Sequence, residues 1–119
     1  MRHVYYARVP HNVRPVYEVK AGLFRVLGHP ARVRIIELLR DGERSVGALQ
    51  TELGLESGAT SQHLAALRRV GLVESRREGT SVFYRAADEK VFDLLAAGRA
   101  LVARQLEDQQ SMLRELAET

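Results

Sequence analysis

The chain has 119 residues, 45% hydrophobic and 28% charged, which is ordinary for a folded domain with a modest core and unlike a disordered chain. It contains no cysteine, which excludes disulfides, thiolate metal sites and cysteine redox sensing. The net charge is only +3, but residues 57–87 carry five arginines against two glutamates, whereas residues 88–119 carry four basic against seven acidic residues. This asymmetry is typical of a protein with one face for nucleic acid.

The N-terminal segment, residues 1–14, is predicted to be an irregular basic arm, since it carries three arginines and no acid. It has no apolar region of the kind found in a secretory signal, so we expect no leader here. No apolar run approaches the ~20 residues that span a bilayer. We therefore expect a cytoplasmic protein that does not engage a membrane.

Two helices are predicted next, from the positions of proline and glycine. Pro15 opens the first and Gly28 ends it. His29-Pro30 begins the second, which has an apolar stripe and closes at Asp41-Gly42. The stripe consists of Ala31, Ile35, Leu38 and Leu39.

A helix-turn-helix is predicted over residues 45–71. Ser45 caps its first helix, and Gly54 ends that helix in a left-handed conformation. Ser57 caps the second helix, which runs to about Val70 and stops at Gly71. Apolar residues hold the pair to the core: Val46, Leu49, Leu53, Leu64 and Leu67. A polar stripe remains free to face a DNA groove, made of Ser57, Ser61, Ala65 and Arg68.

A β-hairpin follows, in which two alternating runs between residues 72 and 86 flank a turn at Glu78-Gly79. A helix-turn-helix followed by a hairpin is a winged helix. The predicted fold is thus mainly α with a small β-hairpin wing.

The last predicted element is a helix from Asp88 to about Ala117, about 45 Å long at 1.5 Å per residue, with Gly98 as its weakest point. So small a domain cannot cover all its apolar positions, and the simplest partner is the same helix of a second copy. Those positions include Val91, Leu94, Leu101, Val102, Leu106, Met112, Leu113 and Leu116. The chain is therefore divided into a basic arm at 1–14, a DNA-binding domain at 15–87 and a dimerisation helix at 88–119.

The segments LGHPARVRIIELL and LQTELGLESGATSQHLAALRRVGLVESRREGTSVFYRA resemble the ArsR/SmtB family of bacterial winged-helix repressors. The resemblance covers residues 22 to about 87 and implies a dimer that pairs through its first and last helices. It also implies binding to an operator palindrome in double-stranded DNA and release when an inducer binds. The dimer interface predicted on this basis comprises Val16, Leu23, Leu27, Val91, Leu94, Leu101, Leu106 and Leu113.

Departures from the family pattern narrow the expectation. Where many members carry a Cys-x-Cys metal site, this chain has Ser45 and Gly47, and the last helix contains no histidine. Reading helices of the family often show Gln-Ser-Thr where this chain has Ser57-Gly58-Ala59, so its operator would differ. Thr80 stands where many wings carry arginine or lysine. The inducer is unknown.

Predicted DNA contacts come from the two helix starts, the reading helix and the wing. Ser57, Ser61 and Gln62 can hydrogen-bond base edges. The alternative is that they cap the helix and lie on a solvated face. Arg68 and Arg69 either contact phosphate or stabilise the helix C-terminus. Arginines 76, 77 and 85 either grip the DNA backbone or decorate a solvated hairpin. The full predicted set is Ser45, Ser57, Gly58, Thr60, Ser61, Gln62, His63, Arg68, Arg69, Arg76, Arg77 and Thr80.

Other chemistries receive little support. His63 is expected to be a partly buried, hydrogen-bonded group, and we predict no metal site and no cofactor. Ser61 and His63 lie about 200° apart around a helix and cannot meet as nucleophile and base, so we expect no enzyme. The predicted function is a homodimeric, sequence-specific DNA-binding regulator, most simply a repressor. Two alternatives remain: a protein-interaction adaptor, and a repressor that senses metal through carboxylates and arm histidines such as His3 and His11.

Overall fold

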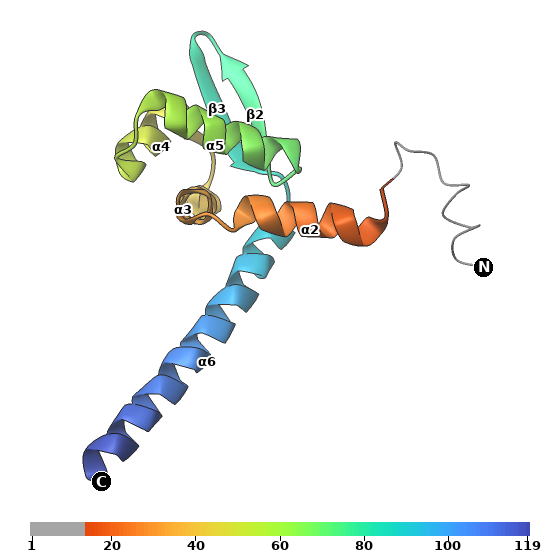
Figure 1. Ribbon diagram of the computed structural model, residues 1–119. Coiled ribbons are helices and arrows are strands. Elements are labelled where there is room, and N and C mark those ends of the chain that lie inside the picture. The colour runs from red at the N-terminus through yellow and green to blue at the C-terminus, as the bar shows by residue number, and fades with distance from the viewer. Residues whose placement is uncertain (1–13) are drawn as a thin grey trace, which may run out of the picture.

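The computed structural model describes residues 14–119, which form a winged helix-turn-helix with one long helix beyond it (Figure 1). The residues of the predicted arm before Arg14 lie outside this range. In chain order the elements are α2 (Val16–Leu27), α3 (Pro30–Leu38), the short 3-10 helix η1 (Leu39–Asp41), β1 (Arg44–Ser45), α4 (Val46–Leu53), α5 (Ser57–Arg69), β2 (Val73–Glu78), β3 (Ser81–Ala86) and α6 (Lys90–Glu118). The predicted fold class, mainly α with a small β wing, is confirmed.

Of the five α-helices in the described residues, α3 and α4 begin with an N-cap side chain that accepts a backbone N–H. His29 caps α3, since its Nδ1 accepts the backbone N–H of Ala31 at 3.1 Å. Ser45 caps α4 in the predicted way, with its Oγ accepting the N–H of Ala48 at 3.1 Å. The prediction that Ser57 caps α5 is wrong. Glu56 occupies the cap, and no side chain closes that end of the helix.

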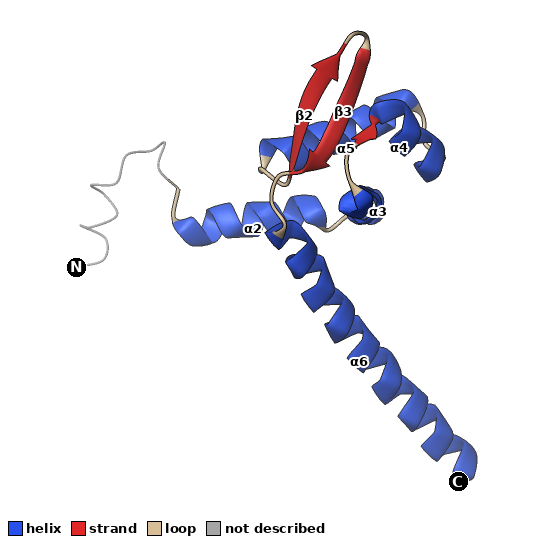
Figure 2. Cartoon of the chain, turned by 180° about the vertical axis from the view of Figure 1, so that it is seen from behind, coloured by secondary structure: helices blue, strands red, loops and turns tan. Residues whose placement is uncertain are grey.

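The sheet has three antiparallel strands in the order β1-β3-β2 (Figure 2). Strand β1 was not expected, because two residues between a turn and a helix carry no readable alternation. The wing turn lies one residue later than predicted. Glu78 pairs with Ser81, so Gly79 and Thr80 form the loop. Gly79 has a φ of 60°, a conformation that glycine adopts without a Cβ clash.

One cluster of buried apolar side chains joins α3, η1, α4, α5, β2 and α6, whereas α2 and β3 contribute residues that are only partly buried against it. Its members are Ile35, Ile36, Leu38, Leu39, Leu49, Leu64, Leu67, Leu72, Val73 and Val91. The assignment of Val91 to the dimer interface is wrong. Its side chain is 6% exposed and belongs to the core of its own subunit. This happens because the first turn of α6 still packs on the body.

Beyond Leu95, its last partly buried residue, α6 leaves the body on the side away from the wing (Figures 1 and 2). Every residue of α6 from position 96 onward is exposed. Across the described part of the chain, no helix combines the length and apolarity needed to cross a membrane.

Candidate nucleic-acid interface

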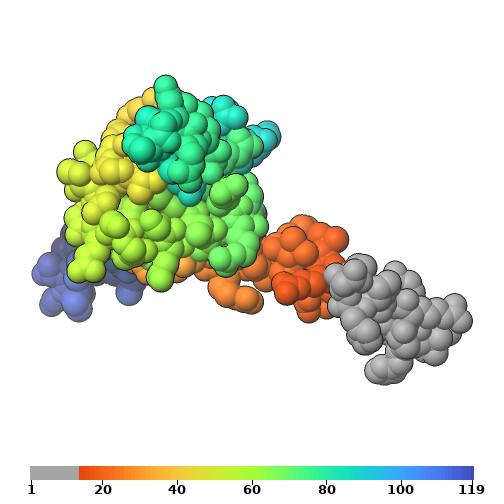
Figure 3. Space-filling view, turned by 90° about the horizontal axis from the view of Figure 1, so that it is seen from above, coloured from red at the N-terminus to blue at the C-terminus, as the bar shows by residue number. Residues whose placement is uncertain are grey.

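The reading helix α5 is held by one face and displays the other. Leu64 and Leu67 are fully buried, and α5 packs against α3, α4 and β2. The opposite stripe is exposed along its whole length, as predicted: Ser57, Ser61, Ala65 and Arg68. Gln62 lies beside this stripe and is also exposed. Figure 3 looks onto this side of the molecule, where α5 and the wing together form much of the surface.

The prediction that Thr60 contacts DNA is wrong. Its side chain is fully buried, and its hydroxyl donates to the backbone carbonyl of Glu56 at 3.1 Å. Because residue 60 falls on the core-facing side of α5, its side chain cannot reach a DNA groove. Its hydrogen bond instead helps hold the first turn of the helix, where no side-chain cap is present.

His63 is tied to the junction of α2 and α3. Its Nδ1 accepts from Nε of Arg32 at 3.1 Å, while Nη1 of Arg32 donates to the carbonyl of Val26 at 3.2 Å. The ring of His29 lies 4.5 Å from that of His63, centroid to centroid. Burial, followed by the proximity of His29 and Arg32, lowers the pKa of His63. The neutral ring with an accepting Nδ1 carries its proton on Nε2, so His63 is the partly buried, hydrogen-bonded group expected from the sequence.

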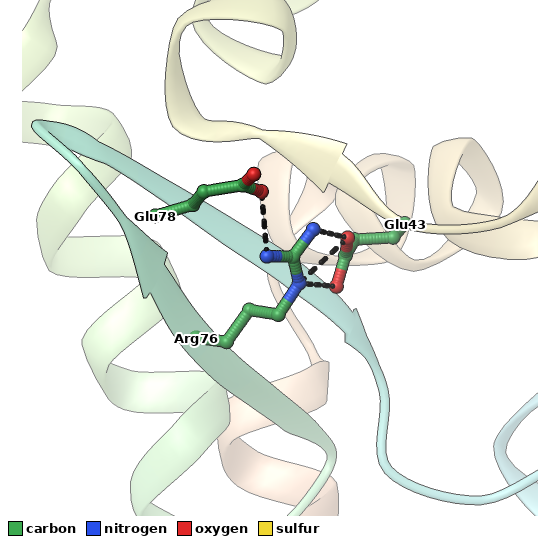
Figure 4. Close-up of polar contacts among 3 residues, drawn as sticks. All are labelled: Glu43, Arg76 and Glu78. Atoms are coloured by element: carbon green, nitrogen blue, oxygen red, sulfur yellow. Dashed lines mark hydrogen bonds and ion pairs between the residues drawn. The ribbon is translucent and has the colours of Figure 1, made fainter.

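The wing arginines differ sharply in their partners. Arg76 donates from all three guanidinium nitrogens: Nε and Nη2 bind Glu43 at 2.6–3.0 Å, and Nη1 binds Glu78 at 2.8 Å (Figure 4). Arg85 pairs with Glu74 at 2.9 Å. Arg77 has no ion pair among the described residues. The wing therefore offers DNA less unpaired positive charge than its three arginines would supply.

The remaining predicted contacts are exposed or near the surface. Gly58, Arg68, Arg69 and Thr80 are exposed, and Ser45 is half-buried with its hydroxyl engaged in capping α4. Whether each of these touches DNA stays a prediction. The sequence did not predict the contacts of Glu43 or Arg32. Glu43 lies 33 positions from its partner Arg76. Arg32, which binds His63, could have been singled out only by its place in the family-like motif of the second helix.

The predicted dimer face is largely uncovered. Large apolar side chains are exposed on both α2 and α6: Val16, Tyr17, Val19, Phe24, Leu101, Val102, Leu106, Met112, Leu113 and Leu116. An open groove of about 900 Å³ lies between α3 and α6, lined by Val33, Phe92 and Leu95 among others. Leu23, Leu27 and Leu94 are partly buried at the edge of the body.

No group of three potential metal ligands comes together within residues 14–119. His3 and His11, the histidines of the metal-sensing alternative, lie outside the described residues.

Comparisons with known proteins agree with this architecture. The family model described as bacterial regulatory protein, arsR family, matches residues 29–75. The chain is 46% identical over 103 residues to the HTH-type transcriptional regulator Rv0081 of Mycobacterium tuberculosis, covering 86% of this chain and 90% of that relative. The crystal structure of Rv0081 matches with a TM-score of 0.75 at 46% identity, over 82% of this chain and 98% of that one.

Two further relatives are informative. The homodimeric winged helix-turn-helix DNA-binding domain of Mb0332 from Mycobacterium bovis, a solution NMR structure, matches with a TM-score of 0.71 at 37% identity, over 76% of this chain and 84% of that one. A biofilm growth-associated repressor of Xylella fastidiosa is 38% identical over 93 residues, covering 75% of this chain and 82% of the relative. Because the family model, these relatives and the winged-helix fold agree, the chain belongs to the ArsR family and is a winged helix-turn-helix transcriptional regulator.

Proposed function

We propose that this chain is a cytoplasmic homodimeric repressor, which binds an operator in double-stranded DNA and leaves it when an inducer binds. The observation that carries the proposal is the exposed polar stripe of α5, which lies beside the wing on a helix anchored by buried leucines. A helix held in this way presents its side chains at fixed positions, as major-groove reading requires. The relative from Xylella fastidiosa is named a repressor, which supports the direction of regulation.

Base reading is assigned to Ser57, Ser61 and Gln62, which are exposed at the first half of α5. A glutamine amide both donates and accepts, so Gln62 can bind the edge of adenine with two hydrogen bonds. Arg68 and Arg69 at the end of the helix, and Arg77 on the wing, lie where positive charge can meet the phosphate backbone. Phosphate contacts supply affinity, whereas the three polar side chains supply preference for one sequence.

Dimerisation is assigned to α2 and α6. The exposed apolar side chains of these helices would be covered by the same helices of a second copy in a two-fold arrangement. Mb0332, which is homodimeric, has the same fold. A two-fold dimer places two reading helices about 34 Å apart, one turn of DNA, and an inducer that changes this spacing would release the operator.

The dimer is tested by replacing Leu106 and Leu113 with glutamate and measuring molar mass in solution. Both side chains are exposed in the isolated subunit, so the replacements leave the winged domain folded. We expect the wild type to be a dimer and the variant a monomer with weakened operator binding. A variant that stays dimeric would place the interface elsewhere.

DNA binding is tested by fluorescence anisotropy with duplexes from the DNA upstream of the protein's own coding sequence, beside scrambled duplexes, at two salt concentrations. A preference of ~10³ or more for one duplex supports a sequence-specific regulator. Adding zinc or a chelator tests the metal-sensing alternative, in which histidines of the arm supply metal ligands. Operator binding that changes with either addition would support that alternative.

An adaptor function is the second candidate, and the uncovered apolar face of α6 is the observation that favours it. In that case the winged helix would be a scaffold without DNA affinity. Steep weakening of DNA binding with salt would contradict this candidate, because it reports neutralised phosphates.

A further inference from the structure

Arg76 spans the width of the small sheet. Its strand, β2, lies at one edge, and Phe83 of β3 stands directly opposite it in the register. Phe83 in turn pairs with Ser45 of β1, the strand at the other edge. Glu43 directly precedes β1, so the Arg76 side chain crosses over β3 to reach a carboxylate at the far edge (Figure 4).

The contacts along this path engage every nitrogen of the Arg76 guanidinium. The guanidinium carbon lies 4.7 Å from the centroid of the Phe83 ring, and two nitrogens hold Glu43 while the third holds Glu78. An isolated exposed ion pair stabilises a protein little, but a guanidinium held on three sides loses most of its freedom to rotate. The hydrogen bonds that Arg76 donates lower the pKa of Glu43, and donating to both acids raises the pKa of Arg76.

We propose that the Arg76–Glu43 pair positions the wing relative to the helix-turn-helix, and that Arg76 itself contacts no phosphate. This inference rests on the proposed DNA-binding function. Glu43 lies in the connection between η1 and β1, which leads directly into α4, so the pair joins the wing to the first helix of the helix-turn-helix. Arg76 is therefore a positioning residue, and Arg77 is the wing arginine that meets the DNA backbone.

A second ion pair on the same hairpin provides a matched control. Glu74 and Arg85 stand opposite each other on β2 and β3, and their carboxylate and guanidinium are 2.9 Å apart. Both members belong to the hairpin, so this pair cannot hold the wing to the rest of the domain. Replacing either Glu43 or Glu74 with glutamine removes one negative charge and one ion pair of a wing arginine, although Arg76 keeps its contact with Glu78. Only the first replacement loosens the attachment of the wing.

The two roles for Arg76 predict changes of opposite sign. If Arg76 bound phosphate, Glu43→Gln would release it from one of its two acidic partners and remove a repelling charge, so DNA affinity would rise. If the pair positions the wing, Glu43→Gln weakens binding although the protein has become more positive. Glu74→Gln measures the effect of the lost charge alone.

The experiment uses the full-length protein and a duplex that the wild type selects from a randomised pool. We expect Glu43→Gln to weaken binding by about threefold or more, and Glu74→Gln to leave it unchanged or tighter. We also expect Arg76→Ala to weaken binding without changing the slope of affinity against salt, whereas Arg77→Ala lowers that slope by about 0.9. Tighter binding by Glu43→Gln, or a reduced slope for Arg76→Ala, would overturn the inference.

A DNA-free readout separates this inference from the function on which it rests. Hydrogen exchange of the backbone amides in β1 and β3 should speed up in Glu43→Gln and not in Glu74→Gln, with the core helices unchanged in both. If the wild type selects no duplex, the proposed function fails while the exchange result still tests the attachment. Equal exchange in the two variants would show that the pair holds nothing.

Discussion

The reading helix and the wing use their polar side chains in different ways. On α5 the polar stripe is exposed, and neither Arg68 nor Arg69 has an acidic partner among the described residues. On the wing, two of three arginines are bound by acids of the same chain, one of them 33 positions away. A helix surface is organised by its own 3.6-residue period, whereas a strand surface is organised by whichever strands and loops lie across it.

We propose that α5 and the wing contribute differently to DNA binding: α5 supplies sequence preference, and the wing supplies one phosphate contact through Arg77. Four measurements test this division, beginning with the one that should produce the largest change.

The largest effect is expected from the buried side of α5. Leu64 is fully buried in the common core, so Leu64→Ala should lower the free energy of unfolding by ~2–5 kcal/mol. Chemical denaturation followed by circular dichroism measures this directly. Ala65→Ser, one position along on the exposed stripe, serves as the control and should change stability by less than about 0.5 kcal/mol. Similar values for the two variants would mean that α5 is not anchored as described.

Base reading by α5 should appear as a loss of preference. Gln62→Ala should weaken binding to the true operator by ~1–3 kcal/mol and binding to scrambled DNA very little, because only the operator offers the matching base edge. Anisotropy titrations against both duplexes measure the two losses. Equal losses would move Gln62 from the reading set to the backbone contacts.

Phosphate contact by the wing should appear as the reverse pattern. Arg77→Ala should weaken binding to operator and scrambled DNA alike, because a phosphate carries no base information. The loss should shrink as salt is raised, since one phosphate contact fewer releases about one counterion fewer. A loss confined to the operator would give the wing a reading role and erase the division between the two regions.

The smallest effect concerns pH and the attachment of α5 through His63. The pKa of His63 is lowered in the folded protein from its ordinary value of 6.5, first by burial and then by His29 and Arg32. The unfolded chain therefore takes up a proton more readily, so this site favours folding above about pH 6.5 and loses that contribution as pH falls through the lowered pKa. Stability measured from pH 7.5 down to about 5.5 should decline less in His63→Asn, which retains His29, than in the wild type. Identical declines would assign the titration to another group.

Residues whose role depends on near neighbours could be predicted from the sequence. The caps at His29 and Ser45 and the left-handed Gly54 follow from bonds within four residues. The exposed stripe of α5 follows from helical periodicity alone. Motif spacing extended these local patterns to the whole winged helix, which the fold and the relatives confirm.

The surroundings of Thr60, Val91 and Arg76 could not be predicted, because they depend on contacts between distant segments. Thr60 is polar but rotates into the core, and Val91 belongs to a long apolar stripe yet packs within its own subunit. Arg76 is one of several basic side chains in the sequence, and its partner Glu43 reaches it only because the segment between η1 and β1 folds beside the wing. Apart from the two-residue strand β1, the helices and strands could be located from the sequence, because short-range hydrogen bonding and periodicity dictate them. Which polar groups remain available for DNA depended on contacts between segments distant in the chain, and no local pattern encodes these.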